Sequence, residues 1–238
     1  MIIQACINGS RHPDFHPRLP TTSEAMVRDA VEVVEAGAAE LHVHPRGSDG
    51  RESLAAVDET IIAIRKACPG TLIGVSTGAW IEGDEQRTRQ TISQWNVRPD
   101  YASVNLSEND APAIMDLLTS KSIGVEAGLA TADDARRFVG LPICDRAFRV
   151  LIELDHERGL GSALDTYDEI IDVLQQASVA RPILLHGFND TVWPFVERAR
   201  QQRFSTRVGL EDGKHLPDGS VARDNAEIVA AAVAIFGP

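Results

Sequence analysis

Short apolar runs alternate with longer amphipathic segments along the chain. Eight such runs, each of four to six residues, consist mostly of β-branched residues and leucine. Runs of this length and composition are typical of parallel strands that are buried on both faces. The predicted strands are Ile2–Ile7, Glu40–Val43, Leu72–Val75, Tyr101–Val104, Ser122–Val125, Arg149–Leu154, Pro182–Leu185 and Ser205–Val208.

The segments between these runs carry residues that typically begin and end helices. Thr22 begins a Thr-Ser-Glu cap region, and Gly37 stands where a helix C-cap glycine belongs. The segment from Thr131 to Asp134 resembles a capping box with aspartate in place of glutamate. The predicted helices are Thr22–Ala36, Ser53–Cys68, Asp84–Gln94, Ala111–Thr119, Thr131–Val139, Ser162–Ala177, Asp190–Gln202 and Ser220–Phe236.

Eight strands that alternate with eight helices predict an α/β fold, the (β/α)8 TIM barrel. The length of 238 residues is close to the roughly 250 residues of one such barrel. We therefore expect residues 1–238 to form a single (β/α)8-barrel catalytic domain. The alternative is a doubly wound open sheet, but Asn8-Gly9-Ser10 after the first run is not the glycine-rich loop of a dinucleotide site.

The net charge of −12 makes nucleic acid and anionic membrane surfaces poor partners. No apolar run reaches the ~18 residues of a membrane span. The three cysteines, Cys6, Cys68 and Cys144, are odd in number and far apart, which argues against a disulfide framework and favours a reducing cytoplasm. We expect a cytoplasmic protein in which an anionic substrate needs a local positive site, such as a metal or an arginine.

Active sites of (β/α)8 barrels lie at the carboxyl ends of the strands and in the loops that follow. Polar residues gather at these positions, and Asp14 lies in the long first loop. This convergence predicts a site that combines metal ligands with acid–base groups. The residues at the predicted strand ends are Asn8, His42, His44, Ser76, Thr77, Asn105, Ser107, Glu126, Glu153, His186, Arg207, Glu211 and Asp212.

His42 and His44 form the sharpest local feature, because residues i and i+2 of a strand point to the same side. Two imidazoles on one side can chelate one metal, and catalytic zinc usually has three protein ligands and an open position. Either Glu211 or Asp212 is placed to complete such a site. The alternative is a pair of hydrogen-bonded histidines at a strand end.

Other candidates have a structural interpretation beside the functional one. Arg207 is a candidate for bidentate binding of a substrate carboxylate, or a surface arginine. Ser76 and Thr77 either hold a carboxylate with hydroxyls and amides or form an ordinary turn. Asp14, in a proline-stiffened loop, is a candidate base or an Asx-turn residue. Asp212 is a candidate base or part of an acidic turn.

The remaining polar residues are more ambiguous. His186 is a candidate for a hydrogen bond to substrate or a satisfied strand-end histidine. Glu126 and Glu153 are candidate site residues or paired core carboxylates. The tryptophans, Trp80 among them, are interpreted as packing residues, and Cys6 has no context that would lower its pKa and make it a nucleophile.

A set of motifs, taken in order, resembles the β-keto acid cleavage enzyme family, whose representative is 3-keto-5-aminohexanoate cleavage enzyme. The likeness is strongest in the first third and returns near the end, while the middle of the chain matches only as strands and helices and is some tens of residues shorter than in usual members. The motifs are Asn8-Gly9, 16–22 (HPRLPTT), 36–38 (AGA), 42–46 (HVHPR), Asp49-Gly50, 63–65 (AIR), 76–78 (STG), 207–212 (RVGLED) and 225–229 (NAEIV).

The resemblance implies a zinc-dependent carbon–carbon bond exchange in which a β-keto acid and acetyl-CoA give acetoacetate and a new CoA thioester. It implies that His42, His44 and Glu211 are ligands of Zn2+ or another divalent metal. It further implies a cytoplasmic homo-oligomer. In the family pattern Ser76 and Thr77 bind substrate, Arg207 and Asp212 bind substrate and assist proton transfer, and Asp14 falls near a glutamate.

Within the resemblance, we expect Arg207, Asp212 and Asp14 to be catalytic residues, with Ser76, Thr77, Asn8, Glu126 and His186 as substrate-binding residues. Two other functions fit the same residues. One is a zinc-dependent TIM-barrel hydrolase of a small carboxylate substrate, in which the open metal position activates water. The other is a non-catalytic metal-binding barrel.

Overall fold

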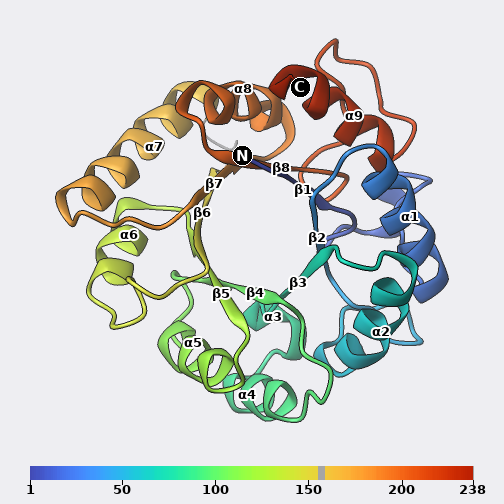
Figure 1. Cartoon of the computed structure of the whole chain (residues 1–238), viewed down its shortest axis with the longest axis horizontal. Coiled ribbons are helices and arrows are strands. Elements are labelled where there is room, and N and C mark those ends of the chain that lie inside the picture. The colour runs from blue at the N-terminus through green and yellow to red at the C-terminus, as the bar shows by residue number, and fades with distance from the viewer. Residues whose placement is uncertain (155–158, 238) are drawn as a thin grey trace.

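A closed barrel of parallel strands in chain order, β1 to β8, forms the centre of the molecule (Figure 1). The computed structural model describes residues 1–154 and 159–237. β1 pairs with both β2 and β8, so the barrel closes and the predicted (β/α)8 fold is confirmed. The strands are β1 Ile3–Cys6, β2 Glu40–Val43, β3 Leu72–Ser76, β4 Tyr101–Asn105, β5 Gly124–Leu129, β6 Arg149–Leu154, β7 Ile183–Gly187 and β8 Ser205–Val208.

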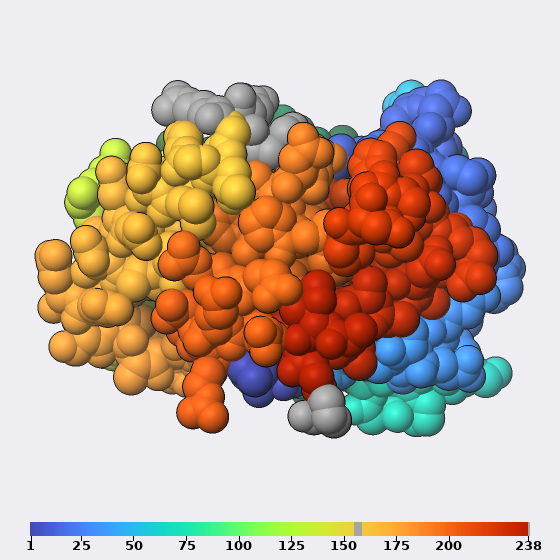
Figure 2. Space-filling model, turned by 90° about the horizontal axis from the view of Figure 1, so that it is seen from above, coloured from blue at the N-terminus to red at the C-terminus, as the bar shows by residue number. Residues whose placement is uncertain are grey.

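Helices surround the barrel as an outer ring (Figure 1). Seen from above, much of the C-terminal third of the chain lies on the visible face (Figure 2), and α8 packs against α9. None of the described helices is long and apolar enough to cross a membrane. The helices are α1 Ser23–Glu35, α2 Val57–Ala67, α3 Ala79–Glu82, α4 Glu85–Ser93, α5 Ala111–Ser120, α6 Ala132–Val139, α7 Gly159–Gln176, α8 Val192–Gln202 and α9 Asn225–Phe236, with 3-10 turns η1 Pro13–Phe15, η2 Leu54–Ala56 and η3 Asn189–Thr191.

The hydrophobic core lies between the strands and the helices, because successive side chains of a strand point to opposite faces. On β2, Leu41 and Val43 are fully buried in this outer layer. Glu40 and His42 alternate with them and point into the barrel. Every β2 residue is buried, so both layers exclude water.

The amino-terminal half of the barrel interior is filled by a buried polar cluster. Arg149 donates to Glu40 and to Glu126, each over 2.5 Å. Gln4 donates to the Tyr101 hydroxyl over 2.7 Å, and the Arg149 guanidinium lies 4.7 Å from the Tyr101 ring centroid. These contacts fill this end with side chains, and the cavity described below lies toward the carboxyl ends of the strands.

The fifth strand corrects one sequence prediction. It runs over Gly124–Leu129 and not Ser122–Val125, because Ser122 has a φ of +58° and belongs to the preceding turn. Ala127 and Gly128 continue the strand although they lack the bulk typical of buried strands. Glu126 therefore lies in the middle of β5 and not at its carboxyl end.

Two further differences from the prediction concern the helices α3 and α9. The short helix α3 was not predicted, since four residues carry no readable periodicity. α9 begins at Asn225 and not at Ser220, with Asp224 capping it through the Glu227 amide. The loop after β8 is therefore longer in the structure than the sequence predicted. The predicted cap at Thr22 and the capping box at Thr131 are confirmed, and Asp84, the first residue of its predicted helix, is the N-cap of α4.

Candidate active site

A cavity of about 450 Å³ opens at the carboxyl ends of the strands. Strand residues and residues that follow the strand ends line it. Its lining contains two imidazoles, two guanidinium groups and two carboxylates among hydroxyl, amide and apolar groups. The lining residues are Ser10, Arg11, His42, His44, Ser76, Trp80, Ser103, Asn105, Ser107, Gly128, Ala130, Glu153, Phe188, Asn189, Arg207 and Glu211.

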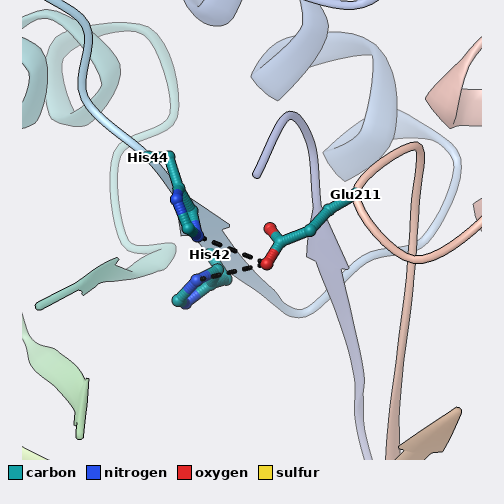
Figure 3. A group of neighbouring side chains, drawn as sticks. All are labelled: His42, His44 and Glu211. Carbon is teal, nitrogen blue, oxygen red and sulfur yellow. Dashed lines mark ion pairs between the residues drawn. The ribbon is translucent and has the colours of Figure 1, made fainter. Parts of the chain in front are cut away.

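His42, His44 and Glu211 converge at one edge of this cavity (Figure 3). Glu211 Oε1 lies 3.3 Å from His44 Nε2 and 3.9 Å from His42 Nε2. One ligand atom from each residue falls within 4.8 Å of the others. Ligands at about 2 Å from a tetrahedral zinc ion lie roughly 3–4 Å apart, so this set fits one divalent ion.

The polar atoms of the group also fit a metal. The Glu211 Oε2 atom is buried, and it has no hydrogen-bond partner among the residues that the structure describes. An unpaired buried carboxylate oxygen is costly unless a cation or donor satisfies it. Two imidazoles and one carboxylate are the donor set that zinc prefers in catalytic sites.

Local backbone geometry brings Glu211 to the two histidines. Gly9 has a φ of +58°, and a Cβ atom there would lie 2.3 Å from Glu211 Cγ, so the close approach requires glycine. Asn8 anchors the end of β2: its side chain accepts from the His44 amide and donates to the His44 carbonyl, each over 2.9 Å. Asn8 is fully buried and does not line the cavity.

The pKa values of the three residues diverge. Burial holds the pKa of His42 well below its usual range. Burial acts in the same direction on His44, but the Glu211 carboxylate and hydrogen bonds with Glu211 and Glu52 raise the pKa of His44 to about 9. Burial would raise the pKa of Glu211, yet Arg207, His44 and His42 together hold it well below its usual range. In the absence of metal, the group thus contains an ionised carboxylate beside a cationic and a neutral imidazole.

Arg207 joins the carboxylates of the last strand loop. Its Nη2 donates to Glu211 Oε1 over 3.0 Å and to Asp212 Oδ1 over 2.8 Å. Its Nε lies 3.3 Å from the other oxygen of Asp212. Burial would lower the pKa of Arg207, but these carboxylates raise it well above its ordinary value. The guanidinium therefore stays charged while it lines the cavity.

Asp212 lies behind Arg207 and is fully buried. Besides Arg207, it accepts from the Cys6 thiol over 2.7 Å and lies 3.5 Å from His186 Nδ1. It does not line the cavity. Arg207 therefore lies between Asp212 and the cavity. Asp212 contacts both Arg207 and His186.

Glu153 lines the cavity, and His186 is buried behind it. His186 Nε2 lies 3.3 Å from Glu153 Oε2, and the Glu153 carboxylate lines the cavity. Burial would raise the pKa of Glu153, but the hydrogen bond and charge of His186, with Arg207, lower it. His186 is buried beneath Glu153 and reaches the cavity through it.

The other predicted residues fall in different places. Ser76 lines the cavity, whereas the Thr77 hydroxyl donates to the Ser103 carbonyl over 2.8 Å. Glu126 is fully buried in the ion pair with Arg149, in the barrel interior below the cavity. Asp14 lies at the protein surface on η1, with its side chain 91% exposed and paired with His12, and it does not line the cavity.

Sequence reasoning did not single out three residues that border the site. Arg11 lines the cavity and donates to the Glu211 and Asp212 carbonyls. Glu52, in the loop after β2, contacts His44. Trp80, interpreted as a packing residue, is 52% exposed and lines the cavity. All three follow the carboxyl end of a strand, Arg11 and Glu52 in loops and Trp80 in the short helix α3, and this position is the signal that the sequence offers for them.

The sequence of this chain is similar to the sequences of known proteins. The family model of the beta-keto acid cleavage enzymes matches residues 1–139. The 3-keto-5-aminohexanoate cleavage enzyme of Acetoanaerobium sticklandii is 32% identical over 108 residues, which cover 44% of this chain and 38% of that relative. The enzyme of the same name from Fusobacterium nucleatum subsp. nucleatum is 25% identical over 257 aligned positions, which cover 96% of this chain and 88% of that relative. The first alignment thus spans less than half of the relative's length, and the second spans most of both chains.

Solved structures share the architecture. The 3-dehydroquinate dehydratase of Geobacillus kaustophilus HTA426 aligns with a TM-score of 0.64 at 13% identity, covering 99% of this chain and 89% of that chain. At this identity the likeness shows the fold alone, since one barrel fold supports many chemistries.

Proposed function

Because this chain belongs to the β-keto acid cleavage enzyme family, and is therefore an enzyme, we propose that it cleaves or exchanges the carbon–carbon bond of a small β-keto acid at a divalent metal, zinc, with acetyl-CoA as cosubstrate. The products are then acetoacetate and a new CoA thioester. The observation that carries the proposal is the convergence of His42, His44 and Glu211 in one cavity with Arg207.

We assign the metal to His42, His44 and Glu211. When bound there, a divalent ion supplies a Lewis acid that polarises a carbonyl and stabilises the negative charge that develops on it. The chain's own residues then bind the substrate carboxylate, keep the charged groups of the site in place and move a proton.

Arg207 and Ser76 bind and orient the substrate carboxylate. Arg207 remains charged under the influence of its neighbours, and it opens on the cavity beside the metal ligands. Arg11 adds a second guanidinium to the lining. Two cationic side chains supply the local positive site that a protein of net charge −12 needs for an anionic substrate.

Asp212 acts through Arg207 and His186, which it contacts directly. We propose that the Asp212 carboxylate holds the guanidinium in place and accepts or returns a proton along this buried contact chain. Asn8, Thr77 and His186 position the strand ends, Glu126 stays within the core cluster, and Asp14 takes part only through a rearrangement of the first loop.

At the level of the whole protein, we propose one catalytic domain over residues 1–238 that acts as a cytoplasmic homo-oligomer. Support for one domain comes from the barrel itself, since β1 and β8, near opposite ends of the chain, pair with each other.

Turnover of β-keto acids by zinc-loaded protein, with and without acetyl-CoA, tests the function. We expect acetoacetate to form only with both acetyl-CoA and metal, and not with the His42→Ala/His44→Ala double mutant. Release of a CoA-independent product would instead support a zinc-dependent hydrolase, and inertness toward every β-keto acid tried would support a non-catalytic barrel.

A further inference from the structure

The loop between β2 and α2 carries a carboxylate that contacts the candidate metal centre from behind. Glu52 Oε1 is hydrogen-bonded to His44 Nδ1, while the other ring nitrogen, Nε2, faces Glu211 at 3.3 Å. Both side chains of the Glu52–His44 pair are largely buried, with 12% and 4% exposed. The two nitrogens of this imidazole are therefore occupied from opposite sides.

The hydrogen bond sets the roles of these nitrogens. An ionised carboxylate only accepts, so Nδ1 donates its proton to Glu52 and Nε2 can present a lone pair to a metal. Glu52 acts as an acceptor through both carboxylate oxygens, because Oε1 faces His44 Nδ1 and Oε2 accepts from the Trp80 indole. Partners of this kind fix the tautomer and the ring orientation of metal-binding histidines.

Glu52 also holds an aromatic side chain at the cavity. The indole Nε1 of Trp80 donates to Glu52 Oε2 over 3.1 Å. The Trp80 ring stacks on His44, with centroids 6.5 Å apart and planes at 21°. The ring also lies against Gly78, where a Cβ atom would come within 2.3 Å of it. One carboxylate thus joins a candidate metal ligand to a half-exposed cavity wall.

The loop that presents Glu52 is itself fixed. Arg46 and Glu52 form an antiparallel bridge, and the Ser53 amide donates to the Pro45 carbonyl over 2.9 Å. Farther on, the Leu54 amide donates to Glu82 of α3 over 3.1 Å. The loop after β2 and helix α3, which carries Trp80, are therefore tied together at two points.

We propose that Glu52 is a positioning residue of the metal centre, which fixes the His44 ring for coordination and couples that ring to Trp80 in the cavity wall. This inference rests on the proposed metal site and deepens it. It predicts that Glu52 sets metal affinity although it is not a ligand, and that the fluorescence of Trp80 reports metal binding.

The first test compares Glu52→Gln and Glu52→Ala with Glu59→Gln, which alters an exposed carboxylate of α2 that lines no part of the cavity. Glutamine keeps the volume of Glu52, but its amide puts a donor nitrogen in place of one of the two oxygens that accept from His44 and Trp80. Titration with Zn2+ against a chromophoric chelator should show affinity weakened about 10–100-fold in both Glu52 variants and unchanged in Glu59→Gln. Circular dichroism confirms that each variant is folded, and glutamine covers the case in which alanine disturbs the loop.

The second test follows tryptophan emission during the same titration. Zinc should change the emission of the parent and of Glu59→Gln, and this change should be absent in Trp80→Phe and reduced in Glu52→Gln. Parent-like zinc affinity in folded Glu52→Gln, or an unaltered emission change in Trp80→Phe, would overturn the inference even in an enzyme that cleaves β-keto acids. Weakened zinc binding in the Glu52 variants sustains it even where no β-keto acid is turned over.

Discussion

At the residue scale, the last strand and its loop supply Arg207, Glu211 and Asp212 to the charged groups at the cavity. Arg207 contacts both Glu211 and Asp212, yet the two carboxylates point in different directions. Glu211 lines the cavity beside the histidines, and Asp212 is buried against Cys6 and His186. Adjacent residues thus have different surroundings, and their substitution should have different consequences.

Replacement of Arg207 by lysine should not be conservative. An ammonium group cannot copy the fork that contacts Asp212 through two nitrogens. We expect kcat/KM for the keto acid to fall about 10-fold or more, because loss of one charge-assisted contact costs ~1.5–3 kcal/mol. Steady-state kinetics measures this, and Arg200→Lys, which alters an exposed arginine of α8, is the matched control. Unchanged kinetics in a folded Arg207→Lys protein would remove Arg207 from the site.

Glu211→Gln and Asp212→Asn should differ in kind. The glutamine variant loses an anionic ligand, so metal binds more weakly and activity partly returns at high metal concentration. The asparagine variant keeps the three proposed ligands but loses the charge that holds Arg207, so turnover falls and added metal does not restore it.

A metal titration of activity for both variants separates these outcomes. If Asp212→Asn loses metal while Glu211→Gln retains it, the assignment of the two carboxylates is reversed. If neither variant changes metal binding or turnover, the loop after β8 does not serve the site.

Residues in one strand were easier to predict than residues in loops. His42 and His44 follow from the two-residue period of a strand, and Glu211 follows from the family pattern. Glu52 and Trp80 could not be placed, because their contact depends on how two loops fold against each other. Glu126 was predicted at the end of the fifth strand because the small residues Ala127 and Gly128 are not typical of buried strands, although β5 continues through them.

At the scale of the elements, α1 and α9 are joined by a buried polar contact that involves no cavity residue. Asn225 at the start of α9 donates to Asp29 of α1 over 2.7 Å and to the Ile7 carbonyl over 2.8 Å. It also accepts from the Leu210 amide. This amide therefore ties the outer ring to β1 and to the loop that carries Glu211, a link that helical periodicity does not reveal.

Burial raises the pKa of Asp29 to about 7, although the hydrogen bond from Asn225 opposes the shift. The folded state therefore holds this proton more tightly than the unfolded state, whose pKa is near 3.8. The resulting stability is fully present below about pH 4 and is lost as the pH rises to about 7, with a slope of at most ~1.4 kcal/mol per pH unit.

Asp29→Asn removes this titration and retains an acceptor for Asn225. Between pH 5 and pH 7.5 the free energy of unfolding of the parent should therefore fall relative to that of the variant. Urea unfolding at the two pH values measures the difference, and Asp116→Asn, which alters an exposed aspartate of α5, is the control. A parallel pH response in parent and Asp29→Asn would contradict the assignment.

At the scale of the whole molecule, closure of the barrel brings together residues that the sequence separates widely. His42 on β2 and Glu211 after β8 meet because β1 lies between these strands and pairs with both. The order of the predicted elements was enough to derive this neighbourhood. The cavity's floor was not predictable, because the cluster of Arg149, Glu40 and Glu126 depends on side chains that cross the barrel.

A metal that binds only the folded barrel should stabilise the whole molecule. Zinc at 100 times its Kd contributes about 2.7 kcal/mol to the free energy of unfolding. For a chain of this size, that raises Tm by about 5–10 °C. Thermal unfolding with and without zinc should show the rise in the parent and none in His42→Ala/His44→Ala. An equal rise in both would place the stabilising metal elsewhere.

The most direct test of the account is the metal content of the purified protein, measured by elemental analysis in the parent and in the His42→Ala/His44→Ala double mutant. We expect about one divalent metal per chain in the parent and none retained by the folded double mutant. Full metal content in the double mutant would contradict it, because the ion would then be held by residues other than His42, His44 and Glu211.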